Sequence, residues 1–240
     1  MSTDLKLGLN LGYWQRGADD ATELVQAAER LGYESVWTTE AYGSDAFTPL
    51  AWYGARTSRI KLGTSVVQIS ARTPAATAMT AMTLDHLTGG RLPLFVFPEK
   101  MERMYGPSLA GAGPDFDIAA MVMTLITDDV RPALDGVKMM LTLYIGGMGA
   151  KSRDFHADII GRMGYAEAAE EIQALYPAGR RDEAFNAIPD ELADGISLVG
   201  PVGRIRERLE PWRRSPVSNL LVMGPRDETS LRTIRDLVLG

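Results

Sequence analysis

Short apolar runs separated by stretches of helical length are the main pattern along this chain. The clearest run covers residues 60–67, which are apolar and often β-branched with almost no alternation, as is typical of a strand buried on both faces of a parallel sheet. Thr73 and Pro74 then provide the polar cap and the first-turn proline of a helix, which Gly89 and Gly90 are expected to end. Residues at helical spacing predict its buried face: Ala75, Ala78, Met79 and Met82.

The same succession of strand and helix recurs along the sequence. After the first predicted strand comes an amphipathic helix, and its apolar stripe is Ala21, Leu24, Val25, Ala28 and Leu31. Alternation of strands and helices predicts an α/β fold with a parallel sheet. Six runs predict strands, over residues 5–11, 35–39, 60–67, 92–97, 117–126 and 219–223.

Length and composition narrow the class of protein. A chain of 240 residues with 45% hydrophobic residues can form one large domain, and a single (β/α) barrel of this size is ordinary. The formal charge of −6 without a basic run argues against nucleic-acid binding. No apolar run approaches the roughly 20 residues of a membrane-spanning helix, and the first residues lack the apolar core of a secretory signal. The absence of cysteine fits a reducing compartment, so we expect a cytoplasmic protein that binds neither nucleic acid nor membrane.

Two residues stand where predicted strands end, which is where ligands collect in parallel α/β proteins. Glu40 follows the second strand; its carboxylate could orient a ring or relay a proton, or it could be a solvated loop residue. Trp14 follows the first strand and either covers the mouth of the sheet or lines a cofactor pocket. With two histidines and no paired acidic motif, no metal site is expected.

A series of motifs also occurs in an order that is familiar from one protein family. The most specific is GTSVVQISARTPAATAMTAMTLDHLTGGR, and the others are LGLNLGYW, SVWTTEAYG, DFDIAA, LYIGGMG, FHADIIGRMGY, PDEL and SLVGP. Together they resemble the luciferase-like monooxygenases, in particular the branch of oxidoreductases that depend on the deazaflavin coenzyme F420. The resemblance covers nearly the whole chain. It implies one domain over residues 1–240 with the TIM-barrel-like (β/α) fold of the bacterial luciferase type.

The family pattern breaks at one place. Relatives continue after the residue that corresponds to Arg91 with further strand and helix units and an insertion that contributes to the cofactor phosphate site. Here LPLFVFPEK follows at once, so about two units are expected to be missing between Arg91 and Leu92. The fold is then shortened to about six recognisable parallel strands, too few for the standard barrel of eight. Such a sheet could stay open or close as a smaller barrel, and a homo-oligomer, most simply a dimer, could cover the gap.

The resemblance also implies where a cofactor binds. Relatives place a cis peptide bond without proline at the position of Ser65–Val66, and often a histidine after the acidic residue at the position of Glu40. Here Ala41 replaces that histidine, which removes an imidazole acid or base. The expected cofactor is F420, with FMN as the alternative, and the expected catalytic residue is Glu40. The expected cofactor-binding residues are Trp14, Glu40, Gly63, Thr64, Ser65 and Val66.

Two functions remain open at this point. The first is an oxidoreductase or monooxygenase that transfers a hydride between a deazaflavin and a small organic substrate. The second is a shortened, non-catalytic protein that binds a flavin or F420, like the non-fluorescent flavoproteins, or an inactive truncated variant. The missing insertion favours the second function, and the retained strand ends favour the first.

Overall fold

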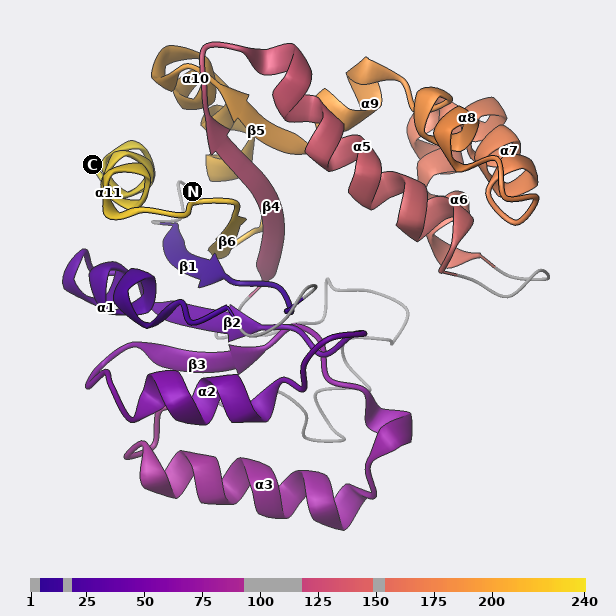
Figure 1. The fold of residues 1–240 in the computed structure, drawn as a ribbon. Coiled ribbons are helices and arrows are strands. Elements are labelled where there is room, and N and C mark those ends of the chain that lie inside the picture. The colour runs from indigo at the N-terminus through magenta and orange to yellow at the C-terminus, as the bar shows by residue number, and fades with distance from the viewer. Residues whose placement is uncertain (1–4, 15–18, 93–117, 149–153) are drawn as a thin grey trace. The chain divides into compact units, whose positions relative to one another are not determined.

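The computed structural model describes most of the chain, namely residues 5–14, 19–92, 118–148 and 154–240 (Figure 1). The chain divides into two compact units, one formed by Met1–Val122 with Leu209–Gly240 and the other by Met123–Arg208. Strand β4 (Ala119–Ile126) and helix α10 (Val202–Arg213) each cross this division, so each contributes to both units.

The first unit is built on a parallel sheet. Its strands lie in the order β3-β2-β1-β6, followed by the first half of β4. Strand β1 pairs in parallel with β2 on one side and with β6 on the other, and β2 pairs in parallel with β3. These strands are largely buried, as their continuous apolar runs require. Their bounds are Lys6–Asn10 for β1, Ser35–Thr38 for β2, Lys61–Thr64 for β3 and Asn219–Met223 for β6.

In the described part of the chain, four helices lie wholly within this unit. Helix α2 packs on β2 and β3, and α3 packs on α2, while α1 contacts α11 (Figure 1). Helix α11 separates an apolar face from a charged one, and it buries Leu231, Ile234 and Leu237. The bounds are Thr22–Arg30 for α1, Phe47–Gly54 for α2, Pro74–Leu87 for α3 and Glu228–Val238 for α11, with a short 3-10 turn η1 at Ile69–Ala71.

The second unit is mainly helical. The second half of β4 pairs in parallel with β5 (Ser197–Gly200), and the helices bury a core of their own that includes Val137, Ile145 and Ile172. The helices are α5 (Val130–Gly146), α6 (Phe155–Ile160), the π-helical turn η3 (Gly161–Tyr165), α7 (Ala166–Leu175), α8 (Arg181–Asn186) and α9 (Asp190–Gly195).

One ion cluster joins α9 to α10 within the second unit. Asp194 accepts hydrogen bonds from Arg204 at 2.7 Å and from Arg208 at 2.9 Å. Burial raises the pKa of the Asp194 carboxyl, but the hydrogen bond from Arg204 and the charges of both arginines outweigh it and hold that pKa below its usual range. The carboxylate is therefore part of the fold, and it ties the helix before β5 to the helix after it.

The prediction of a parallel α/β fold is confirmed, and six strands form one sheet within the described residues, although they are not all the six that were predicted. The strands predicted over residues 5–11, 35–39, 60–67 and 117–126 are present but shorter, and the strand predicted over residues 219–223 has the predicted bounds. Strand β5 was not predicted, and most of the strand predicted over residues 92–97 lies outside the described residues. Among the helices that the structure describes, none is long and apolar enough to cross a membrane.

Helix α3 corrects one prediction and confirms another. Thr73 caps the helix as expected, because its hydroxyl accepts a hydrogen bond from the backbone N–H of Ala76 at 3.1 Å. The predicted buried face is wrong, since the buried residues are Ala81 and Leu84. Small and apolar residues occur all around this helix, and its contact with α2 selects the other side. The residues predicted to be buried are exposed: Ala75, Ala78, Met79 and Met82.

Candidate active site

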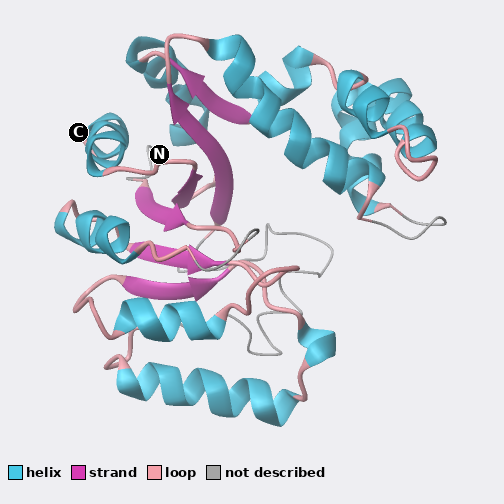
Figure 2. Cartoon of the chain, in the orientation of Figure 1, coloured by secondary structure: helices cyan, strands magenta, loops and turns pink. Residues whose placement is uncertain are grey.

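The carboxyl ends of β1, β2 and β3 form one edge of the sheet, because the three strands are parallel and in register (Figure 2). Backbone hydrogen bonds continue past the strands. The N–H of Thr39 donates to Gly12 at 2.9 Å, the N–H of Ser65 donates to Thr38 at 2.8 Å, and the N–H of Glu40 donates to Val66 at 2.8 Å. The loops that follow the three strands are thus held together, and we call this edge the rim.

The end of β3 presents its backbone to the rim. The peptide bond between Ser65 and Val66 is cis, as the family resemblance predicts. The hydroxyl of Thr39 donates to the Ser65 carbonyl at 2.5 Å, which ties the loop after β2 to this peptide. Val66 is 65% exposed, although its side chain is apolar. Ser65 and Val66 can therefore offer a small apolar surface to a ligand, and their role as cofactor-binding residues stays a prediction.

Glu40 lies at the rim in contact with a cation. Both of its carboxylate oxygens accept from one guanidinium nitrogen of Arg72, at 3.2 and 3.3 Å. Only 10% of the Glu40 side chain and 23% of the Arg72 side chain are exposed. Arg72 also lies 3.9 Å from Asp45 and 5.3 Å from the ring centre of Phe47. Glu40 is therefore a fixed and largely buried carboxylate rather than a solvated loop residue, while its catalytic role stays a prediction.

Arg72 is a site residue that the sequence reasoning missed. It follows η1 and precedes the cap of α3, so the loop between β3 and α3 places it opposite the loop after β2. The signal was present in the sequence, because Arg72 is the only charged residue between Lys61 and Asp85. A single charge in a long uncharged run needs a partner when it is partly buried.

Gly63 and Thr64 occupy the last positions of β3. A Cβ at Gly63 would lie 2.6 Å from the Cδ2 and Cζ3 atoms of Trp37, so the glycine makes room for that indole. The Trp37 ring is held in turn by its N–H, which donates to the Ser35 hydroxyl at 2.8 Å. Packing thus accounts for Gly63 without a cofactor. Thr64 is half-buried beside Thr38, and contacts of either residue with a cofactor stay predictions.

Trp14 is half-buried in the loop after β1, and its backbone N–H donates to the Ser44 hydroxyl at 3.2 Å. Its side chain reaches the Tyr53 hydroxyl of α2. Burial raises the pKa of Tyr53, and the hydrogen bonds from the Ala21 backbone and the Trp14 side chain lower it in part. Trp14 therefore joins the β1 loop to α2, and whether it also touches a cofactor stays a prediction.

Asn10 leaves one polar atom at the end of β1 without a partner. Its side-chain oxygen accepts from the N–H of Gly12 at 2.8 Å, but its buried Nδ2 finds no acceptor among the residues that the structure describes. Gly12 has a φ of +69°, and a Cβ placed there would meet no atom of the described residues within 4 Å. A buried donor, open space and the exposed Val66 together fit a flat heteroaromatic ring that carries hydrogen-bond acceptors.

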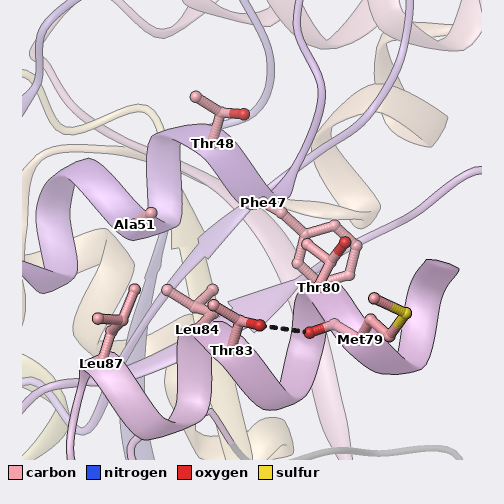
Figure 3. A pocket seen from close by; sticks show the side chains of 8 residues that line it. All are labelled: Phe47, Thr48, Ala51, Met79, Thr80, Thr83, Leu84 and Leu87. Atoms are coloured by element: carbon pink, nitrogen blue, oxygen red, sulfur yellow. Dashed lines mark hydrogen bonds between the residues drawn. The ribbon is translucent and has the colours of Figure 1, made fainter.

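The rim is distinct from a metal site and from the groove on the first unit. In the described ranges, no group of three or more histidine, aspartate or glutamate side chains could hold a metal ion. A groove of about 410 Å³ lies between α2 and α3 rather than on the rim (Figure 3). Its lining includes none of Glu40, Ser65 and Val66, and consists of Phe47, Thr48, Ala51, Met79, Thr80, Thr83, Leu84 and Leu87.

Comparison with known proteins gives consistent matches over the whole chain. The family model described as luciferase-like monooxygenase matches residues 6–98 and 97–219. A putative coenzyme F420-dependent oxidoreductase of Mycobacterium tuberculosis is 34% identical over 347 aligned positions, which cover 99% of each chain.

Solved structures show the same fold. The coenzyme F420-dependent tetrahydromethanopterin reductase of Methanopyrus kandleri superposes with a TM-score of 0.73 at 16% identity, covering 98% of this chain and 99% of that one. The oxygenating constituent of 3,6-diketocamphane monooxygenase from Pseudomonas putida, in complex with FMN, has a TM-score of 0.50 at 15% identity, covering 98% of each chain. The predicted TIM-barrel-like fold of the luciferase type is therefore confirmed.

Proposed function

Because the chain belongs to the luciferase-like monooxygenase family, we propose that it is an oxidoreductase that transfers a hydride between coenzyme F420 and a small organic substrate. One observation carries this proposal. The ends of β1, β2 and β3 keep three features at one rim: the exposed apolar residue Val66, the buried donor of Asn10 that has no acceptor among the described residues, and the fixed carboxylate of Glu40. That combination suits a redox-active ring whose reaction needs a held face and a nearby proton acceptor.

Each residue has a proposed role toward the bound ring. Ser65 and Val66 contact one face of it, and the Asn10 amide donates to an acceptor atom on its edge. Glu40 orients the substrate or moves a proton, and Arg72 keeps the Glu40 carboxylate in place. The deazaflavin supplies the hydride chemistry when it is bound. Trp14 and Thr64, at the same strand ends, extend the proposed contact surface.

The choice of cofactor and the domain organisation rest on the relatives. The name of the mycobacterial relative supports F420, and the FMN complex of the Pseudomonas protein supports FMN as the alternative. We keep the proposal of a single shortened barrel domain that lacks a family segment after Arg91. It is supported by an alignment of 347 positions, which exceeds the 240 residues of this chain. The same observation favours the second candidate, a non-catalytic protein that binds the cofactor.

Turnover with F420 separates the two candidates. We expect the purified protein to change the absorbance of oxidised or reduced F420 in the presence of one member of a panel of small alcohols, aldehydes and ketones. Glu40→Gln should lower kcat by about 100-fold while F420 binding is retained, because a positioned acid or base contributes about that much. The matched control is Glu34→Gln, which removes a lysine-paired carboxylate at the opposite end of β2 and should leave kcat unchanged. Binding without turnover across the panel would favour the non-catalytic candidate.

A further inference from the structure

We propose that Tyr13 and Tyr42 form an aromatic wall at the rim that selects substrates with an uncharged, planar ring. We call these two residues the tyrosine pair. Tyr13 follows β1 and Tyr42 follows β2, so both belong to the first unit and to loops that start from the rim. The inference deepens the proposed oxidoreductase by naming its substrate class, and it rests on that proposed function.

Tyr42 exposes an aromatic ring to solvent. The residue is 78% exposed, and its ring contacts that of the half-buried Tyr13 edge to face, with ring centres 6.4 Å apart and planes inclined at 71°. An edge-to-face contact occupies at most one face of a ring, so the exposure of Tyr42 leaves ring surface on which a ligand can stack. Single exposed aromatic residues are common on protein surfaces, and what distinguishes Tyr42 is therefore its position.

Two hydrogen bonds between the loops hold the tyrosine pair at the rim. In the first, the N–H of Thr39 donates to the Gly12 carbonyl at 2.9 Å, just before Tyr13. In the second, the N–H of Trp14 donates to the Ser44 hydroxyl at 3.2 Å, just after Tyr13. The two loops are therefore joined on both sides of the tyrosine contact. A ligand meets rings that are already in place, which lowers the cost of ordering them on binding.

The tyrosine pair also lies close to the residues that are proposed for the chemistry. Tyr42 comes two residues after Glu40, so their Cα atoms are at most about 7 Å apart. The N–H of Glu40 donates to the Val66 carbonyl at 2.8 Å, and Val66 is 65% exposed. A substrate that stacks on Tyr42 can therefore place its reacting carbon near Glu40 and near the Val66 surface on which the cofactor ring is proposed to bind.

Charge at the rim disfavours anionic substrates. Within the described parts of the loops after β1, β2 and β3, Arg72 is the only cationic residue, whereas the acidic residues are Asp19, Asp20, Glu40 and Asp45. Arg72 is paired with Glu40 at 3.2 Å and lies 3.9 Å from Asp45. A substrate phosphate or carboxylate would be repelled by these acidic groups and would compete with Glu40 for the guanidinium. Recognition at this edge therefore depends on ring stacking rather than on ion pairing.

Ligand-observed NMR titration measures this selection without turnover. The probes are secondary alcohols that differ in ring and charge, namely 1-phenylethanol, 1-cyclohexylethanol and 4-(1-hydroxyethyl)benzoate. We expect protein saturated with F420 to bind 1-phenylethanol about fivefold more tightly than either of the others, because one aromatic contact contributes about that factor. Equal binding of the phenyl and cyclohexyl compounds would overturn the proposal. Tighter binding of the benzoate, through a cation such as Arg226 after β6, would overturn it as well.

Substitution of Tyr42 tests whether its ring causes the preference. Tyr42→Ala should abolish the preference for 1-phenylethanol over 1-cyclohexylethanol and, in turnover, raise KM for 1-phenylethanol rather than lower kcat, whereas Tyr42→Phe should keep the preference. The matched control is Phe155→Ala in α6, since Phe155 is 66% exposed but belongs to the second unit. Circular dichroism should be unchanged in these variants because both side chains are exposed.

The outcomes separate this inference from the proposed function. Saturable F420 binding with a preference that survives Tyr42→Ala, or that Phe155→Ala removes equally, would overturn the role of the tyrosine pair and leave the oxidoreductase standing. The absence of saturable F420 binding would instead overturn the oxidoreductase and its substrate class together.

Discussion

Replacing Gly63 by alanine is expected to destabilise the protein by about 1–3 kcal/mol, as overpacking of a buried site does. The new methyl group would lie 2.6 Å from the Cδ2 and Cζ3 atoms of Trp37. Neither the Gly63 backbone nor the Trp37 indole can move away easily. Gly63 is paired within the sheet opposite Trp37, and the indole N–H is bonded to the Ser35 hydroxyl.

Denaturant unfolding followed by tryptophan fluorescence measures this change. All four tryptophans, Trp14, Trp37, Trp52 and Trp212, belong to the first unit, so the signal reports on that unit. The control is Gly136→Ala in α5, where a Cβ would meet no atom of the described residues within 4 Å. Denaturant unfolding followed by circular dichroism should show that the free energy of unfolding rises by about 0.5–1 kcal/mol. An unchanged midpoint for Gly63→Ala would mean that the glycine does not serve the packing of Trp37.

The substitution Arg72→Ala, which removes the guanidinium, is expected to lower the free energy of unfolding by about 2 kcal/mol. The substitution leaves the largely buried Glu40 carboxylate without its cation, and breaking a buried pair from one side costs more than the pair contributes. The partial exposure of Arg72 reduces the loss below that of a fully buried pair. The contact of its guanidinium with the Phe47 ring is lost as well.

A double-mutant cycle separates the ion pair from these other contacts. If the pair dominates, the variant that combines Arg72→Ala with Glu40→Ala should lose clearly less stability than the sum of the two single variants. The control is Arg30→Ala, which removes an exposed pair with Glu228 and should change stability by less than about 0.5 kcal/mol. Strict additivity of the two rim substitutions would show that Glu40 and Arg72 do not stabilise each other.

Short, largely apolar runs made most of the fold predictable from sequence. Strands β1, β2, β3 and β6 are such runs, and they are buried in the parallel sheet. Strand β5 was missed because its apolar run is only Leu198 and Val199, which Gly200 and Pro201 follow directly. A run of that length cannot be told from a helix end by periodicity.

The errors on α3 and at the rim have different causes. Helix α3 is apolar on more than one side, so its sequence alone does not determine which side faces α2. The pair of Glu40 and Arg72 joins residues 32 positions apart, and no local pattern couples them. The cis peptide at Ser65–Val66 was predicted by family resemblance and by nothing in the residues themselves.

The most direct test of a cofactor site at the rim is a titration of the purified protein with F420, followed by its absorbance and fluorescence. We expect a saturable change with a dissociation constant in the micromolar range, about −8 kcal/mol in binding free energy. Val66→Glu should weaken binding at least tenfold, because it places a charge on the exposed apolar surface at the end of β3, whereas Met139→Glu should leave it unchanged. No saturable binding of F420 or FMN by the wild-type protein, or equal binding by Val66→Glu, would contradict a ring site at the ends of β1, β2 and β3.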